Sequence, residues 1–82
     1  MPPAQRITAI VSRMLVKRGG TPNPTPLLNL REAGLTSLDM VNLMLAIEAE
    51  FGIEIPQSAM TPDNFDTIGA MAMLLAALAR AA

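Results

Sequence analysis

The stretch from Thr36 to Phe51 constrains the fold of this chain more than any other. It begins with Thr36 and Asp39, which match the pattern of a Ser or Thr followed three residues later by an acidic residue, a signature of helix starts. Apolar residues then recur three and four positions apart, the spacing of an amphipathic helix. The sequence therefore predicts a helix from Leu38 to about Phe51, with Ser37 at its start.

The composition is typical of a small helical protein. The chain has 82 residues, enough for one domain, which we expect to span residues 1–82. Hydrophobic residues make up 51% and aromatic residues only 2%. Without Cys or His, the chain has no thiolate for a disulfide or a metal and lacks the usual base of neutral-pH catalysis. The longest apolar run, Ile68 to Ala79, is too short to span a membrane, so we expect a soluble, cytoplasmic protein.

A first helix is predicted from the opening prolines to about Arg18, where Gly19 and Gly20 stop it. Its expected core face has helical spacing and holds Ile7, Ile10, Val11, Met14 and Leu15. The connection over residues 21–36 carries alternating prolines, which block helix and favour an extended path. Three leucines should fasten it to the core and argue against a disordered linker: Leu27, Leu28 and Leu30.

After Pro56 we expect a loop over residues 57–60 and then a single helical turn over residues 61–65, with Thr61 as its cap. A last helix should start at Asp66 and Thr67 and fray over residues 76–82. Its predicted core face holds Ile68, Met71, Ala72, Leu75, Leu78 and Ala79, widened by Met73 and Leu74. Together these segments predict an all-α fold with three longer helices, one short third helix and a long first loop.

The second predicted helix carries two apolar stripes. The stripe assigned to the core holds Met40, Leu43, Met44, Ile47 and Phe51. The other stripe holds Leu38, Val41 and Leu45, and the remaining face holds Asp39, Asn42, Ala46 and Glu50. Two interpretations of the other stripe stay open: a helix buried on two sides, or an exposed patch that docks a partner.

Ser37 lies where a helix leaves backbone N–H groups unpaired and carries partial positive charge. An anion attached to this serine, such as a phosphate, would be favoured there. The simpler interpretation is that Ser37 is a cap residue or the neighbour of one, because such caps are routine at helix starts. The chain shows no metal-spaced cluster, Gly-rich phosphate loop or nucleic-acid-binding stripe of basic and aromatic residues.

The residues around Ser37 resemble the acyl carrier protein family. Two stretches carry the resemblance: residues 30–39, with a Gly-x-x-Ser-Leu core, and residues 47–56, with an acidic-Phe-x-x-x-Ile-Pro ending. The resemblance covers most of the chain. It implies a four-helix bundle of acyl-carrier type, in which Ser37 bears covalent 4'-phosphopantetheine, derived from coenzyme A. It also implies that the second stripe meets partner enzymes, with a partner-binding set of Leu38, Asp39, Val41, Asn42, Leu45 and Glu48.

Three positions depart from the family pattern. Thr36 stands where aspartate is most common, and Asn42 and Ala49 stand where fatty-acid carriers often have glutamate. The thinner acidic patch favours a dedicated partner and a specialised carrier, with an amino acid as one possible cargo.

The charges are divided along the chain. Five basic residues and one acidic residue precede Ser37, whereas six acidic residues and one basic residue follow it. The division reflects either ordinary solvated faces or steering of basic partners to the second half.

The sequence raises three classes of function: an enzyme, a carrier and an adaptor. An enzyme using Ser37 would need an adjacent base, which this chain lacks, so we expect a non-catalytic protein without catalytic or metal-binding residues. A carrier would hold an acyl or aminoacyl group as a thioester. We expect it to be a monomer that serves a phosphopantetheinyl transferase, an acyl- or aminoacyl-loading ligase and downstream acyl-using enzymes, and binds neither nucleic acid nor membrane. The alternative is an unmodified helical adaptor that binds through the second stripe.

Overall fold

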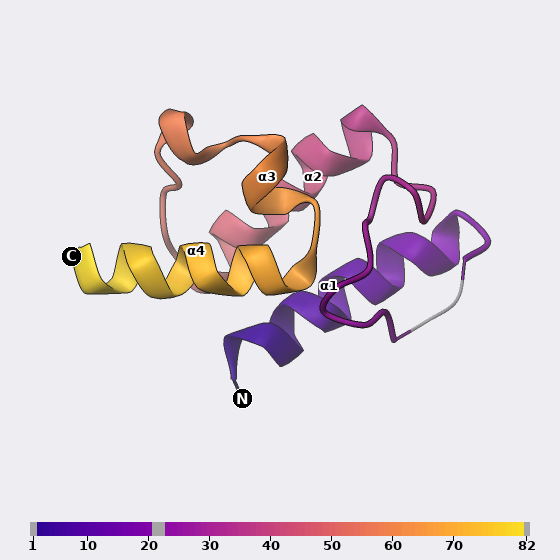
Figure 1. Cartoon of the computed structure of the whole chain (residues 1–82), viewed down its shortest axis with the longest axis horizontal. Coiled ribbons are helices and arrows are strands. Elements are labelled where there is room, and N and C mark those ends of the chain that lie inside the picture. The colour runs from indigo at the N-terminus through magenta and orange to yellow at the C-terminus, as the bar shows by residue number, and fades with distance from the viewer. Residues whose placement is uncertain (1, 21–22, 82) are drawn as a thin grey trace.

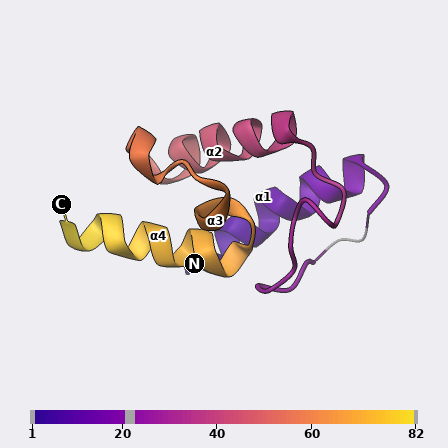
Figure 2. The same ribbon diagram turned by 45° about the horizontal axis from the view of Figure 1, so that its top comes forward.

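The computed structural model describes residues 2–20 and 23–81 and contains, within them, four α-helices and a short 3-10 helix. The elements are α1 (Pro3–Lys17), α2 (Ser37–Phe51), η1 (Gln57–Ala59), α3 (Pro62–Phe65) and α4 (Ile68–Ala81). α1 packs against α2 and α4, and α3 packs against α4 (Figure 1 and Figure 2). The predicted all-α fold is confirmed. Among the described residues, no helix is both long and apolar enough to cross a membrane.

α1 begins and ends where proline and glycine favour it. Pro3 occupies the first helical position, where its missing N–H costs nothing. After the helix, Gly19 adopts a left-handed φ of 82°, and the Gly20 N–H donates to the Leu15 carbonyl at 2.8 Å. The predicted core face is confirmed, with Met14 half-buried and four residues fully inside: Ile7, Ile10, Val11 and Leu15.

The first loop is tied to the junction between α3 and α4. The Leu30 N–H donates to the Asp66 carbonyl at 2.8 Å, and the Gly69 N–H donates to the Pro26 carbonyl at 3.0 Å. An ion pair between Arg31 and Asp66, at 3.1 Å, adds a side-chain tie at the same place. With Leu30 completely buried, the loop acts as an ordered strap, as the leucines predicted.

Two expectations for this loop are wrong. Leu27 is 87% exposed, because the chain turns at residues 26–27 and directs that side chain away from the core. Residues 30–34 form successive turns instead of an extended path, and these turns bring Leu35 into the core, which the pattern did not indicate. Leu28 is half-buried against the core, as expected. The part of the prediction that concerns residues 21 and 22 lies outside the described residues.

α2 follows the sequence prediction closely. Thr36 is its N-cap, and Gly52 ends it with a left-handed φ of 63°, its N–H bonded to the Glu48 carbonyl. The predicted core stripe is confirmed, since Met44 and Phe51 are half-buried and the rest are buried: Met40, Leu43 and Ile47.

The chain after α2 is more helical than expected. Residues 57–59 form η1 in place of a loop. α4 extends to Ala81, and alanine, the residue with the highest helix propensity, fills much of its last turns. The fraying expected from residue 76 onward stays a prediction. The expectation for Ala82 lies outside the described residues.

α3 and α4 start at the predicted places. Pro62 is the first residue of α3, but its N-cap Thr61 makes no side-chain capping bond. At the start of α4, the Thr67 hydroxyl accepts the Ala70 N–H at 3.0 Å. The α4 core face is confirmed for Ile68, Met71 and Leu75 but wrong for Met73, which is 75% exposed, and for Ala79, which is also exposed.

Candidate functional site

Ser37 is the first residue of α2, and it is exposed. The cap itself is Thr36, whose hydroxyl accepts the Asp39 N–H at 3.1 Å. Thr36 therefore fills the capping role although the acyl carrier family most often has aspartate at this position, and Ser37 is the neighbour of the cap. Among the described residues, the Ser37 hydroxyl makes no hydrogen bond, which leaves it accessible for chemistry.

Asp39 joins the start of α2 to α1. Its carboxylate accepts the Thr36 N–H at 2.9 Å and two N–H groups of Arg18 at 2.9 and 2.8 Å. The bonds from Arg18, and then the one from the Thr36 backbone, lower the pKa of the Asp39 carboxyl from 3.8 to about 2. Asp39, which the resemblance placed in the partner-binding set, is only 8% exposed, and its charge is paired within the chain.

The second stripe of α2 is exposed. Leu38, Val41 and Leu45 are 67%, 49% and 56% exposed, respectively, so the interpretation that α2 is buried on two sides is wrong. Three large apolar side chains on one helix face, without cover from the described residues, form a small patch suited to docking. We call Leu38, Val41 and Leu45 the apolar stripe.

The polar residues around the apolar stripe are less acidic than the resemblance implied. Asn42 is exposed beside it. Glu48 is half-buried, and its carboxylate accepts the Ile55 N–H at 2.8 Å, which fixes the chain after α2. Ala46, which shares the remaining face of α2 with Asn42, packs partly against the core. Much of the predicted acidic set therefore serves the fold.

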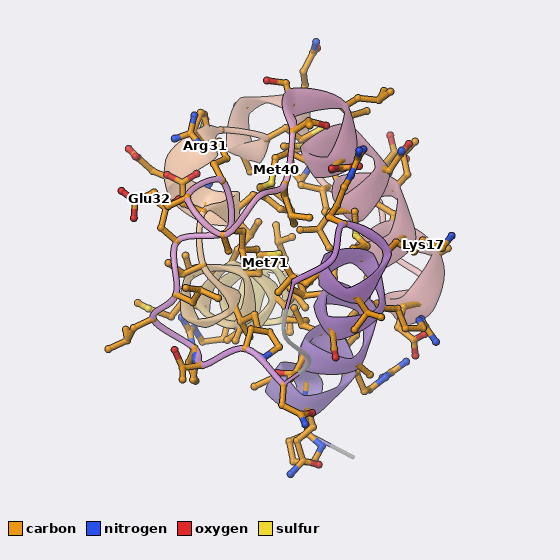
Figure 3. The ribbon with its side chains drawn as sticks, turned by 90° about the vertical axis from the view of Figure 1, so that its right-hand side faces the viewer. Lys17, Arg31, Glu32, Met40 and Met71 are labelled. Carbon is orange, nitrogen blue, oxygen red and sulfur yellow. The ribbon has the colours of Figure 1, made fainter. Side chains whose placement is uncertain are left out.

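A hollow of about 240 Å³ opens beside Ser37. Most of its lining is apolar, and Met44 and Met60 give it adaptable walls. The charged part of the lining is the ion pair Arg31–Asp66. Of the lining residues labelled in Figure 3, Arg31 lies at the molecular surface and Met40 points into the interior. The sequence pattern assigned neither Arg31 nor Arg18 to the site. The only sequence feature that pointed to these two arginines was the surplus of basic residues before Ser37.

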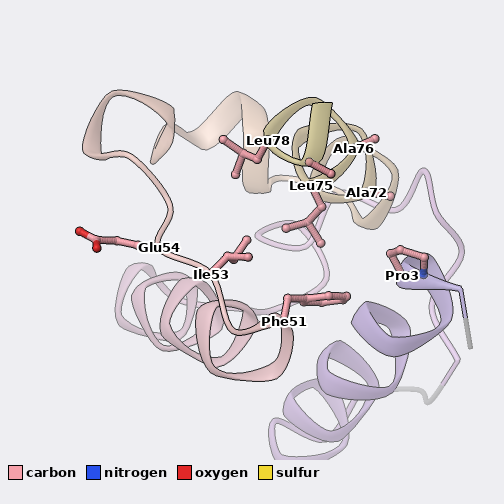
Figure 4. Close-up of a pocket in the computed structure, with 9 residues that line it drawn as sticks. Pro3, Phe51, Ile53, Glu54, Ala72, Leu75, Ala76 and Leu78 are labelled. Atoms are coloured by element: carbon pink, nitrogen blue, oxygen red, sulfur yellow. The ribbon is translucent and has the colours of Figure 1, made fainter. Parts of the chain in front are cut away.

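A larger cleft, of about 500 Å³, lies at the other end of α2 (Figure 4). Phe51 and Ile53 form one wall, and Leu75 and Leu78 of α4 form the other. At 1.5 Å per residue, the 15 residues of α2 separate this cleft from Ser37 by about 20 Å. The candidate reactive group, the Ser37 hydroxyl, therefore lies at the smaller hollow and not at this cleft.

The fold and the site together define a class of protein. A four-helix bundle with a short third helix presents an exposed serine at the positive end of α2, where an anionic group is favoured. The same helix presents an apolar stripe on which other proteins can dock. This is the arrangement of a carrier protein, which holds a prosthetic group and offers it to enzymes.

Comparison with known proteins identifies the family. Residues 5–75 match the family described as phosphopantetheine attachment site, and the chain belongs to it. The protein is thus a carrier of acyl or aminoacyl groups, held as thioesters on 4'-phosphopantetheine. The resemblance to acyl carrier proteins is confirmed.

Several similar proteins are named aminoacyl carrier protein, and one, from Dictyostelium discoideum, is named mitochondrial acyl carrier protein. The chain is 48% identical over 63 residues to aminoacyl carrier protein 1 of Bradyrhizobium diazoefficiens, covering 77% of this chain and 70% of the relative. It is also similar to a chain in the crystal structure of Bradyrhizobium japonicum glycine:[carrier protein] ligase complexed with cognate carrier protein and an analogue of glycyl adenylate. That match has a TM-score of 0.75 and 40% identity, and covers 90% of this chain and 96% of the other. In a structure of the same ligase complexed with glycylated carrier protein, the match has a TM-score of 0.72 and 42% identity, and covers 87% and 96%.

Proposed function

We propose that 4'-phosphopantetheine is attached to Ser37 and that the cargo is an amino acid, delivered by an aminoacyl-loading ligase. The observation that carries the attachment site is the Ser37 hydroxyl, which is exposed and unbonded at the first position of a helix already capped by Thr36. The names of the relatives support the amino-acid cargo. The complexes of similar carrier proteins with a glycine ligase support the ligase as partner.

The residues present fit the prosthetic group. In attachment by a phosphopantetheinyl transferase, the Ser37 oxygen would bond to the phosphorus that bears the pantetheine portion of coenzyme A. Adenosine 3',5'-bisphosphate would leave, and the serine proton would pass to a base of the transferase. Attachment would leave a negatively charged phosphodiester at Ser37, which the N-terminus of α2 and Arg31, a residue that lines the same hollow, would stabilise. When bound, the group supplies a thiol that holds the cargo as a thioester.

The chain itself is not expected to catalyse a reaction. Activation of a serine requires a base within hydrogen-bond reach, and this sequence has no His, no Tyr and a single Lys. We propose instead that transferase, ligase and downstream enzymes dock on the apolar stripe with Asn42 at its edge, next to Ser37 on the same helix. On this proposal the carrier acts as a monomer in the cytoplasm.

The test is the intact mass of the protein before and after incubation with coenzyme A and a broad-specificity phosphopantetheinyl transferase. The wild type should gain the mass of one phosphopantetheine, whereas Ser37→Ala should gain none. Ser58→Ala is the matched control, because Ser58 is also an exposed serine in a short helical segment, and it should gain the full mass. The modified wild type should then be glycylated by glycine:[carrier protein] ligase with ATP and glycine.

Two results would contradict the proposal. Equal modification of Ser37→Ala and wild type would place the attachment at another residue. A modified wild type that accepts fatty acyl groups but none of several amino acids would leave the site intact and reject the amino-acid cargo. Circular dichroism of each variant shows whether it is folded.

A further inference from the structure

The charges of the two halves of the chain are largely paired with each other. All three ion pairs among the described residues join a base before Ser37 to an acid after it: Arg6–Glu50, Arg18–Asp39 and Arg31–Asp66. The acidic residues of α2 are therefore already partnered by arginines, apart from Glu48, whose carboxylate bonds the Ile55 N–H. An acidic docking face, as in the family pattern, is not what α2 presents.

Two cations on α1 have no such partner among the described residues. Arg13 and Lys17 are exposed, and four positions apart they lie on one side of the helix. Together with Asn42 and Ala46 of α2 they line a hollow of about 290 Å³ between the two helices. We call this hollow the basic groove.

The basic groove borders the apolar stripe. Asn42 lines the groove. It lies four positions after Leu38 and three positions before Leu45, so its side chain adjoins both leucines on the helix surface. On the other flank of the stripe, Val41 lines the hollow beside Ser37. Lys17 and Arg31 accordingly lie at opposite edges of the molecule in Figure 3. The exposed face thus runs from the Ser37 hollow across the stripe to the groove.

We propose that the basic groove is the charged part of the docking face and receives an acidic surface segment of the aminoacyl-loading ligase. This inference rests on the proposed function, since it concerns the enzyme that loads the arm on Ser37. Apolar contact on the stripe holds the partner, and carboxylates facing Arg13 and Lys17 set its orientation and raise the rate of encounter. Fatty-acid carriers often have glutamate at the position of Asn42. Because Asn42 is neutral, no carboxylate at this position competes with those of the partner for Arg13 and Lys17.

The experiment measures loading of phosphopantetheine-bearing carrier by glycine:[carrier protein] ligase, with ATP and glycine, at low and at high NaCl concentration. Arg13→Glu should raise the KM for the carrier about fivefold at low salt, with kcat unchanged, and high salt should shrink the difference. Arg80→Glu is the matched control: it makes the same charge change on the exposed last turn of α4 and should stay within about twofold of wild type. Leu45→Ser, on the apolar stripe, should raise KM at both salt concentrations.

The outcomes separate this inference from the one on which it rests. If the modified wild type is not glycylated, the proposed ligase is wrong and the groove has no such partner. If the wild type is glycylated but Arg13→Glu has the KM of wild type or a lower one, the ligase stands and the basic groove is not part of its docking face. Equal increases for Arg13→Glu and Arg80→Glu would indicate a general effect of net charge and would also overturn the inference.

Discussion

Asp39 shows how a residue that resembles a docking charge can belong to the fold. One oxygen of its carboxylate accepts both the Thr36 N–H and an N–H of Arg18, and the other accepts a second N–H of Arg18. The start of α2, and with it the position of Ser37, is thereby fixed to the end of α1. The ion pair with Arg18 exists only when the carboxylate is ionised.

Protonation of Asp39 should therefore weaken the fold in a defined pH range. Because the pKa of the Asp39 carboxyl is about 2 in the folded protein and 3.8 ordinarily, its contribution to stability is present above about pH 4 and is lost as the pH falls toward 2. Asp39→Asn should lower the melting temperature at pH 6, and this difference from wild type should shrink between pH 4 and pH 2. Thermal unfolding followed by circular dichroism measures it.

The control for this prediction is Asp63→Asn, which changes an exposed aspartate in the same way. It should alter the melting temperature little at any of these pH values. A difference between Asp39→Asn and wild type that stays constant from pH 6 to pH 2 would mean that the carboxylate charge contributes nothing.

At the scale of elements, local sequence determines the helices better than the loop between them. Periodicity, capping residues and glycine stops depend on neighbours within a few positions, and they predicted α1, α2 and the position of Ser37 well. The direction of each loop side chain depends on distant bonds, such as the one from Leu30 to Asp66. The pattern therefore could not tell buried Leu30 from exposed Leu27.

The same limit applies to the candidate site. The apolar stripe could be identified by its spacing, but whether another helix covers it depends on how the helices pack. Arg18 lies 21 positions from Asp39 and pairs with it only because α1 and α2 lie side by side. Nothing in the local sequence indicates that Arg18 pairs with a distant aspartate, whereas Arg13 remains exposed in the basic groove.

The two leucines of the loop provide a matched test of its role as a strap. Leu30→Ala should lower the free energy of unfolding by about 2–5 kcal/mol, because a fully buried leucine is truncated and leaves a cavity. Leu27→Ala should change it by less than about 0.5 kcal/mol, since that side chain is 87% exposed. Urea unfolding measures both, and similar values for the two variants would contradict the assignment of the strap.

At the scale of the whole molecule, two ion pairs clamp the antiparallel pair α1 and α2 at both ends. Arg18–Asp39 closes the end near Ser37, and Arg6–Glu50 closes the end near the large cleft. For a chain of this length the total stability is expected to be on the order of 4–12 kcal/mol, so even small contributions from such ties are a noticeable fraction of it. The basic residues of the first half and the acidic residues of the second half thus serve chiefly to join the two halves of the chain through ion pairs.

The clamp made by Arg6 should depend on more than its ion pair. Its guanidinium bonds the Glu50 carboxylate and the Glu50 carbonyl, each at 2.7 Å, and lies 4.3 Å from the centre of the Phe51 ring. Arg6→Ala removes all three contacts and should lower the free energy of unfolding by about 1–2 kcal/mol. Glu50→Ala keeps the bond to the carbonyl and the ring contact, and should cost about 0.5 kcal/mol or less, because alanine also favours the helix. Urea unfolding of both variants at low and high salt checks this. An equal loss for the two variants, abolished by salt, would show that the clamp is only the exposed ion pair.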